Sequence, residues 1–399
     1  MTENHNLKLK IALLSTCLVS ASLNAVTGMV PEMANSFPTV SLSTIELIAT
    51  VPSLFQMAGV LGGPFLAKRL GYKGVMLLGL LLCAIGGVIP IFLPLFPVIL
   101  LTRCFFGIGC GLMVSSLLTL IIVFFDGQTR STMIGLNGGI SGLGSAFATF
   151  AAGQLLAFGW NVSFAVYFLG FVVALLVFVA VPSVAPECKE QIRFANTVRD
   201  KEQIESKEQK IRPALPIGLW GLGCLMFVSV LFATMYVIKA STLISEYGYG
   251  TAKEGSLAIT LLSLGSFAAG LTYGKIRAKL GTISLALFYA ICLAGFVVGG
   301  MATSLLPVWV GAFLLGYGYL GFMPFLQEQA SRSYGAYGET ATNLILIFQS
   351  VGAFVTPWLG SLFGLFTKDL KLQFFFTAGC FGVLLLVAVW IWQREKKEA

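Results

Sequence analysis

The sequence predicts an all-α membrane protein in which twelve transmembrane helices form two pseudo-symmetric six-helix bundles. Hydrophobic residues make up 57% of the 399 residues, whereas charged residues make up only 11%. Soluble domains carry about 25% charged residues, and a soluble chain this apolar would aggregate through its exposed surface. The apolar residues also form runs long enough to cross a bilayer, and the basic residues gather in alternate breaks between these runs.

Each apolar run is predicted to be a helix, because lipid offers no hydrogen-bond partner to an exposed backbone group. The runs are 10–31, 44–66, 74–94, 97–124, 131–156, 161–182, 214–240, 254–274, 282–303, 305–327, 341–365 and 372–392. Many are longer than the ~20 residues that a bilayer requires, which allows the helices to tilt.

The basic residues in the breaks predict the orientation. If the N-terminus is inside, the cytoplasmic side receives Lys8, Lys10, Lys68, Arg69, Lys73, Arg130, the seven basic residues between Lys189 and Arg212, Lys275, Arg277, Lys279, Arg332, Arg394, Lys396 and Lys397. The outside then receives only Lys253, Lys368 and Lys371. Because Lys and Arg concentrate in cytoplasmic loops, we expect a multi-pass protein of the cytoplasmic membrane with both termini cytoplasmic.

One long polar segment, residues 186–213, separates six predicted helices from six others. Its mixed charges, as in DKEQIESKEQK, are typical of a solvated linker. The sequence therefore divides into an N-terminal bundle over 1–185, a cytoplasmic linker over 186–213 and a C-terminal bundle over 214–399. A regulatory role for the linker is an alternative to a simple connection.

The two predicted bundles share short patterns. The basic segment that ends at Gly71 resembles the one that ends at Gly281, 210 positions later. The pattern at Phe106-Gly107-Ile108-Gly109 recurs as Leu315-Gly316-Tyr317-Gly318, at a shift of 209. Two matches at nearly the same offset indicate a duplicated six-helix unit. In such proteins the binding site lies between the repeats near the middle of the membrane.

Several other classes of function are excluded by the pattern of residues. The net charge of +8 comes from loops rather than from a basic domain, so no nucleic-acid partner is expected. The eight cysteines form no CxxC pair, and the single histidine, His5, lies in the N-terminal tail, so no metal site is expected. Walker A, HExxH and G-x-S-x-G motifs are also missing, and we expect no enzyme activity and no cofactor.

Together, the six-plus-six arrangement, a basic turn and a fourth-helix motif resemble the major facilitator superfamily over the whole chain. The family's second-to-third turn is similar to G-x-L-A-D-R-x-G-R-R, and here it reads PFLAKRLGYK over 64–73, with Lys68 at the acidic position. The family's fourth-helix pattern R-x-x-x-G-x-G matches Arg103, Gly107 and Gly109. The antiporter pattern G-P-x-x-G-G aligns with 148–153, where Thr149 replaces the proline, so it assigns no substrate.

Charged residues near the outer ends of the predicted helices are the first candidates for substrate binding or proton coupling. Arg103 lies inside the fourth helix, where an unpaired charge costs roughly 2.5–3.5 kcal/mol on insertion scales. We expect Arg103 to face a cavity or to pair with Glu32 or Glu46; the alternative is a static ion pair or a side chain that reaches the surface. For Glu46 the alternative is stabilisation of a helix start, and for Lys239 it is snorkelling to the surface.

Uncharged polar residues on the predicted helices are the second group of candidates. By resemblance to the family, the side chains that line a central cavity are Asn24, Gln56, Asn137, Tyr236, Asn343 and Gln349. The alternative for each amide is a hydrogen bond between helices. A cytoplasmic gate is expected from Lys68, Arg69, Lys73, Asp126, Arg130, Glu328 and Arg332.

These observations predict a secondary active transporter that moves a small organic solute across the cytoplasmic membrane by alternating access. We expect proton coupling and efflux; the alternatives are an uptake symporter for an organic anion or metabolite, a flippase for a lipid-linked substrate, and a receptor that transports nothing. The expected partners are a small-molecule substrate, protons and membrane lipids, and the expected oligomeric state is a monomer.

Overall fold

The computed structural model describes residues 3–125, 127–182, 216–333 and 339–398. Its α-helices are α1 (Glu3–Ala21), α2 (Val30–Ser36), α3 (Leu42–Phe92), α4 (Phe96–Phe124), α5 (Gly127–Leu155), α6 (Leu169–Ala180), α8 (Ile217–Glu246), α9 (Ala252–Leu280), α10 (Ser284–Gly300), α11 (Leu305–Ser333), α12 (Glu339–Phe366) and α13 (Leu370–Glu398). Short 3₁₀ segments are η1 (Ser22–Asn24), η2 (Thr27–Met29), η3 (Leu156–Phe158), η4 (Val162–Phe168) and η5 (Gly281–Ile283). The predicted linker over 186–213 lies outside the described residues.

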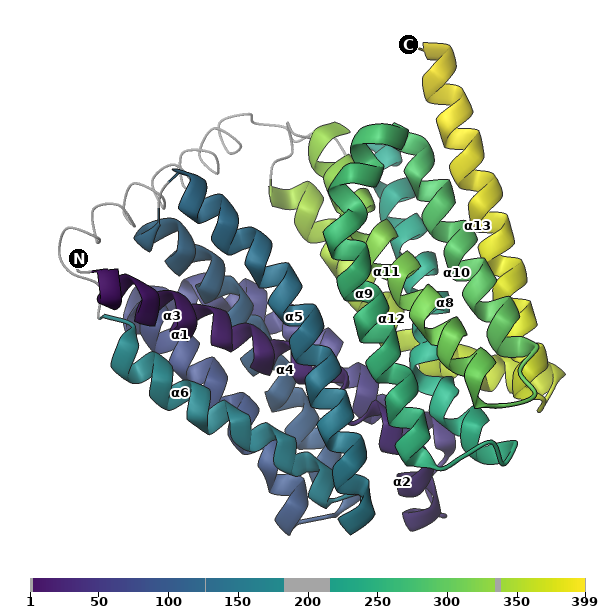
Figure 1. Cartoon of the computed structure of the whole chain (residues 1–399), viewed down its shortest axis with the longest axis horizontal. Coiled ribbons are helices and arrows are strands. Elements are labelled where there is room, and N and C mark those ends of the chain that lie inside the picture. Colours follow the sequence, from purple (N-terminus) through teal and green to yellow (C-terminus); the bar gives the residue numbers. More distant parts are fainter. Residues whose placement is uncertain (1–2, 126, 183–215, 334–338, 399) are drawn as a thin grey trace.

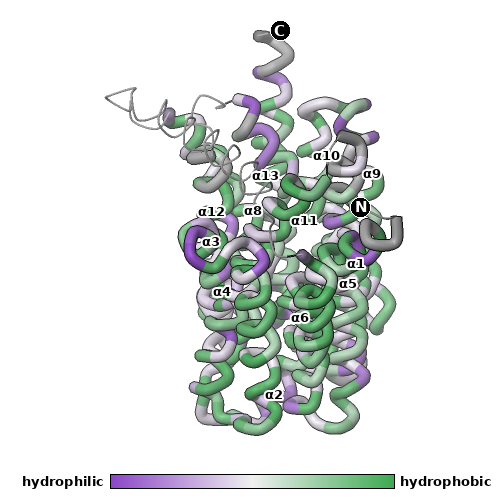
Figure 2. Tube along the Cα trace, turned by 90° about the vertical axis from the view of Figure 1, so that its left-hand side faces the viewer, coloured by the Kyte–Doolittle hydropathy of each residue, from purple (hydrophilic) through white to green (hydrophobic). Residues whose placement is uncertain are grey.

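Ten segments of the described chain are long and apolar enough to cross a membrane. Two of them, Leu42–Phe92 with 51 residues and Ala252–Gly300 with 49, are each long enough for two crossings. Both double back at a glycine with positive φ, 71° at Gly71 and 57° at Gly281, a backbone conformation that other residues rarely adopt. The ten segments therefore account for the twelve predicted runs, and Figure 2 shows hydrophobic residues along most of each helix.

Two bundles, each with its own core, make up the molecule (Figure 1). The N-terminal bundle contains α1–α6, and the C-terminal bundle contains α8–α13. Large apolar side chains fill both cores, whereas many other Leu, Phe and Val side chains are exposed on the outside, as lipid contact requires. Across the bundles, α5 packs against α9 and α3 packs against α12.

Equivalent close contacts recur in the two bundles. A Cβ atom at Gly107 would lie 2.3 Å from the carbonyl oxygen of Pro52, and one at Gly316 would lie 1.9 Å from that of Leu262. Pro52 and Leu262 are themselves 210 positions apart, close to the offset of the repeated patterns. In each bundle, therefore, the first glycine of the repeated pattern lets two helices approach until their backbones touch.

The first predicted span, 10–31, differs from a single continuous helix. It is α-helical only to Ala21 and then continues through η1 and η2 before α2 begins at Val30. Pro31 stands in the first turn of α2, where its missing N–H costs no hydrogen bond. The break places Gly28 against the C-terminal bundle, where its carbonyl oxygen accepts a hydrogen bond from Ser241 Oγ at 2.5 Å.

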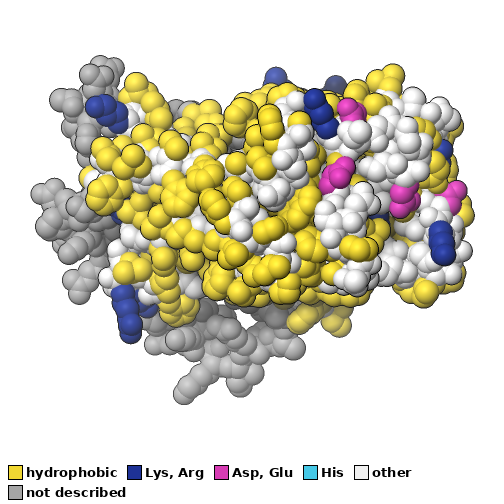
Figure 3. Space-filling view, turned by 90° about the horizontal axis from the view of Figure 1, so that it is seen from below, with side chains coloured by type: hydrophobic (Ala, Val, Ile, Leu, Met, Phe, Trp, Pro, Cys, Tyr) yellow, Lys and Arg dark blue, Asp and Glu magenta, His cyan; other side chains and the backbone are white. Residues whose placement is uncertain are grey.

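The two bundles meet mainly at one end of the molecule. We call the end where the N- and C-termini lie the terminal end, and the opposite end the far end. Figure 1 shows the helices of the two bundles side by side toward the far end and splayed apart toward the terminal end. Figure 3 looks onto the far end, where the visible acidic side chains lie over the C-terminal bundle.

Candidate functional site

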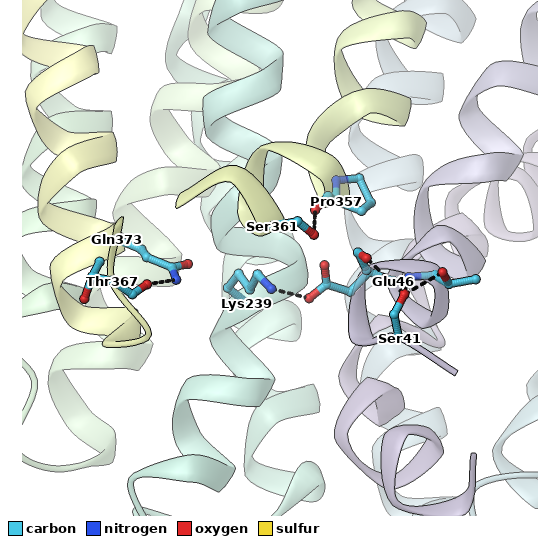
Figure 4. Close-up of polar contacts among 9 residues, drawn as sticks. Ser41, Glu46, Lys239, Pro357, Ser361, Thr367 and Gln373 are labelled. Carbon is cyan, nitrogen blue, oxygen red and sulfur yellow. Dashed lines mark hydrogen bonds and ion pairs between the residues drawn. The ribbon is translucent and has the colours of Figure 1, made fainter. Parts of the chain in front are cut away.

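A buried ion pair joins the two bundles near the far end. Oε1 of Glu46, on α3, lies 2.6 Å from Nζ of Lys239, on α8. The side chain of Glu46 is 0% exposed and that of Lys239 is 7% exposed. Figure 4 shows the two side chains reaching toward each other across the gap between their helices. The structure thus brings together two predicted site residues that are far apart in the sequence and belong to different bundles.

A third helix, α12, contributes to this ion pair through a residue that has no side chain. A Cβ atom at Gly360 would lie 2.9 Å from Cε and 3.3 Å from Nζ of Lys239. Glycine at this position therefore leaves room for the lysine to extend toward Glu46. Pro357, one turn earlier in α12, accepts a hydrogen bond through its carbonyl oxygen from Ser361 Oγ (Figure 4).

Glu46 does not serve as the cap of its helix. Ser41 is the N-cap of α3, and its hydroxyl accepts a hydrogen bond from the N–H of Thr44. Glu46 lies five residues after this cap, beyond the first turn. The helix dipole stabilises an acid most within the first turn. Its second oxygen, Oε2, has no hydrogen-bond partner among the described residues. The ionised carboxylate therefore depends on Lys239 for most of its compensation.

A second contact between the bundles joins α5 to α9 through hydroxyl groups. The Oγ atoms of Ser145 and Ser263 lie 2.9 Å apart, and the Oγ1 atoms of Thr149 and Thr260 lie 3.0 Å apart. Hydrogen bonds of this kind between membrane helices contribute only about 0.6 kcal/mol each. Each of these contacts between the bundles is therefore individually weak.

Arg103 lies elsewhere, inside the N-terminal bundle. The residue is 0% exposed, and its NH1 donates a hydrogen bond to the Tyr167 hydroxyl at 2.9 Å. Its guanidinium carbon lies 4.7 to 5.0 Å from the ring centroids of Phe106, Phe164 and Tyr167. Nε and NH2 have no hydrogen-bond partner among the described residues. Aromatic faces, rather than the expected Glu32 or Glu46, thus surround this cation.

Through Tyr167, Arg103 is connected to the break in the first span. The Tyr167 hydroxyl accepts from Arg103 and donates to the carbonyl oxygen of Ser22, in η1, at 3.2 Å. The break continues to Gly28, which contacts the C-terminal bundle at the far end. Arg103 is thus linked, through Tyr167 and η1, to the segment that contacts the other bundle.

Two of the uncharged candidates, Tyr236 and Asn137, form hydrogen bonds within one bundle. Tyr236 is buried and donates a hydrogen bond to the carbonyl oxygen of Val308 at 2.6 Å. Asn137 accepts one from Cys17 Sγ at 2.9 Å, which links α5 to α1. These are the helix-to-helix hydrogen bonds that the alternative interpretation expected. The uncharged candidates Asn24 and Gln56 are half-buried. The charged candidate Glu32 is exposed on α2.

At the terminal end, the predicted gate residues contact their own bundle. Glu328 lies 2.7 Å from NH2 of Arg332 and 3.6 Å from Nε of Arg277, and it accepts a hydrogen bond from Tyr273 at 2.8 Å. In the N-terminal bundle, Lys73 donates to the carbonyl oxygen of Phe178.

Of the remaining gate candidates, Lys68 and Arg69 are exposed, and Lys68 lies over the Phe65 ring. Asp126 lies outside the described residues, as do the side chains of Arg130 and Asn343.

A hollow of 290 Å³ opens in the C-terminal bundle toward the terminal end. Its lining residues are Gly270, Tyr273, Leu320, Met323, Pro324 and Gln327. On α9, the residues that contact α5 are Thr260, Ser263 and Phe267. Gly270 follows them at helical spacing, so the hollow lies on the same face of α9 as the contact with α5. The candidate Gln349 accepts a hydrogen bond from Gln327 at 3.2 Å, which places an amide pair beside this mostly apolar space.

The sequence interpretation missed several residues of this site. Tyr167 gave no signal, because its link to Arg103 depends on how η4 packs against α4. Gly360 was one glycine among 45. Tyr273 and Gln327 could have been found from the helical spacing of polar residues along α9 and α11, which places them on one side of each helix.

Comparisons with known proteins agree with this architecture. The model of the Major Facilitator Superfamily matches residues 12–357. The proton-coupled antiporter flippase LtaA of Staphylococcus saprophyticus is 25% identical over 342 residues, which cover 81% of this chain and 78% of that protein.

Two solved structures share the fold. The crystal structure of a D-xylose–proton symporter superposes with a TM-score of 0.72 at 14% identity and covers 97% of both chains. A partially occluded inward-open conformation of the xylose transporter XylE from E. coli superposes with a TM-score of 0.69 at 15% identity, covering 97% of this chain and 98% of that one. At such low identity the two structures show the fold alone.

Proposed function

Because this chain belongs to the major facilitator superfamily, a family of carriers, we propose that it is a proton-coupled antiporter that exports a small amphipathic solute by alternating access. The observation that carries the proposal is the buried Glu46–Lys239 pair, which holds the two bundles together at the far end. The terminal end is then the cytoplasmic side, as the distribution of basic residues predicts.

Protonation of Glu46 couples the proton to the movement of the bundles. A buried ion pair is stable only while both partners are charged, because each charge offsets the desolvation of the other. A proton on Glu46 removes this attraction and leaves Lys239 as an unpaired cation between the bundles. The far end then opens, since the hydroxyl contacts between α5 and α9 are individually weak. Release of this proton toward the cytoplasmic side restores the pair and closes the far end, so the proton that entered from outside moves inward.

The terminal-end hollow is the proposed entry point for the solute. Its lining is mainly apolar, with the Tyr273 hydroxyl and the Gln327 amide as hydrogen-bonding groups. Such a surface suits a solute that has an apolar body and a small number of neutral polar groups. In the proposed cycle the solute binds here from the cytoplasm and leaves at the far end, while one proton moves inward.

A flippase for a lipid-linked substrate is the second candidate function. The relative LtaA, whose name describes a proton-coupled antiporter flippase, matches 81% of this chain and favours this candidate. An apolar hollow with a few polar groups also suits a substrate that carries a hydrocarbon chain. The two candidates share the same coupling mechanism and differ in whether the substrate must carry a lipid anchor.

Reconstitution into proteoliposomes with an imposed pH gradient tests the proposal. Fluorescent amphipathic solutes, organic anions and lipid-linked sugars serve as probes, and Glu46→Gln serves as the uncoupled variant. We expect the parent protein to concentrate a probe against its gradient while protons move the opposite way, and an uncoupler to abolish this accumulation. Glu46→Gln should still equilibrate the probe but should not concentrate it.

Other outcomes decide among the alternatives. Accumulation in the same direction as the protons would identify a symporter. Movement restricted to lipid-linked probes would identify a flippase. If Glu46→Gln concentrates the probe as well as the parent does, proton coupling through the ion pair is wrong.

A further inference from the structure

A line of polar groups on α8 leads from the far surface to the buried ion pair. Lys239, Thr242 and Glu246 follow one another at spacings of three and four residues, so they lie on one face of the helix. Glu246 is the last residue of α8 and is exposed, whereas Thr242 and Lys239 are 4% and 6% exposed. The face therefore runs from water at Glu246 to the interface between the bundles.

Glu246 interacts electrostatically with both members of the ion pair. Its carboxylate attracts Lys239 and repels Glu46 across the interface. Within the described parts of the chain, the charged groups that act on Glu46 are Lys239 and Glu246, both on α8. On the neighbouring α2, Glu32 is exposed. A proton that binds to Glu246 would weaken the repulsion of Glu46 and the attraction of Lys239.

A buried oxygen atom on this face of α8, Oγ1 of Thr242, has no hydrogen-bond partner among the described residues. The same is true of Oε2 of Glu46, across the interface on α3. A buried polar atom without a partner costs about 1–3 kcal/mol, so each such atom needs an explanation. A hydroxyl can donate one hydrogen bond while it accepts another, which is the property that a proton relay requires.

We propose that Glu246 and Thr242 form a proton-access route from the far surface to Glu46. The inference rests on the proposed proton coupling and adds the path by which the proton arrives. Glu246 takes a proton from external water, the Thr242 hydroxyl accepts a proton on one side as it donates its own on the other, and Glu46 Oε2 receives it. Glu246 lies seven positions after Lys239, about 10 Å along the helix, so water completes the path between the side chains.

Infrared difference spectroscopy of oriented proteoliposomes tests the route without a substrate. The external pH is lowered rapidly while the internal pH is buffered, and the carbonyl stretch of protonated Glu46 is followed with time. The band is assigned by its loss in Glu46→Gln. In Glu246→Gln and Thr242→Val we expect the band to reach its full amplitude about 100-fold more slowly. This factor is the lower limit of the rate loss expected when one proton-transfer group is removed.

Matched controls separate this role from a general effect of charge or packing. Thr242→Ser keeps the hydroxyl and should keep the parent rate. Glu254→Gln removes the same charge from the far end of the same bundle, and glutamine still completes the capping box of α9. Its rate should also equal that of the parent.

One result would contradict the proton route, and another would contradict the coupling proposal. If the Glu46 band grows at the parent rate in both Glu246→Gln and Thr242→Val, the route is wrong and the coupling proposal stands. If no Glu46 band forms in the parent protein at any external or internal pH, the coupling proposal itself fails. A thermal melt of each variant shows whether a slow rate reflects an unfolded protein.

Discussion

Lys239→Met is expected to destabilise the protein by roughly 3–5 kcal/mol at neutral pH, because it leaves the carboxylate of Glu46 buried without its partner. The double variant Glu46→Gln/Lys239→Met should recover most of this loss, since it removes both charges together. The free energy of unfolding can be measured by reversible denaturation in mixed micelles. Stability of the single variant should rise as pH falls, because a protonated Glu46 no longer needs a cation.

Lys253→Met is the control for this prediction, because Lys253 is an exposed lysine at the far end. Its removal should change the free energy of unfolding by no more than about 0.5 kcal/mol. Equal stability of Lys239→Met and the parent protein at neutral pH would mean that Glu46 is not ionised in this conformation. The proposed coupling would then lack its electrostatic basis.

Arg103→Met should reduce proton-driven accumulation of a transported probe about tenfold, although Arg103 touches no residue of the C-terminal bundle in the described structure. The variant cuts the connection from α4 through Tyr167 to Ser22, and one hydrogen bond to a charged group is worth about 1.5–3 kcal/mol. Overall stability should change little, because the apolar side chain loses this hydrogen bond but also avoids burying Nε and NH2 without partners.

Tyr167→Phe provides the matched test of this positioning role. It removes the hydroxyl that receives the Arg103 hydrogen bond and keeps the aromatic ring. We expect the same loss of accumulation as for Arg103→Met. If Tyr167→Phe accumulates the probe normally while Arg103→Met does not, Arg103 acts by another mechanism, such as direct contact with the substrate. Normal accumulation by both variants would remove Arg103 from the functional site.

Much of the fold could be predicted from the sequence, because hydropathy and basic loops report directly on the solvent. The apolar runs predicted the helices, and the repeated segments that end at Gly71 and Gly281 predicted two equivalent turns. The break after Ala21 was missed because single Ser, Asn, Thr and Gly residues, such as those in η1 and η2, also occur inside continuous membrane helices. Its cause is packing against α8 and α9, which hydropathy does not contain.

The candidate site was predicted less completely than the fold. Glu46 and Lys239 were each identified as charges in the membrane, but their pairing depends on how two bundles meet and leaves no pattern in the sequence. Arg103 was expected to find an acidic partner, yet the structure gives it aromatic faces and one hydroxyl. Charge alone therefore indicated which residues matter, and the tertiary packing decided what each of them contacts.

The far end should open when Glu46 loses its charge, and a distance measurement tests this most directly. Spin labels at Leu95→Cys, in the N-terminal bundle, and Leu306→Cys, in the C-terminal bundle, would replace exposed leucines at the far end in a background without native cysteines. In double electron–electron resonance the parent at neutral pH should give one short distance, and Glu46→Gln should add a longer one. Identical distance distributions for the two proteins would contradict the claim that this ion pair holds the bundles together.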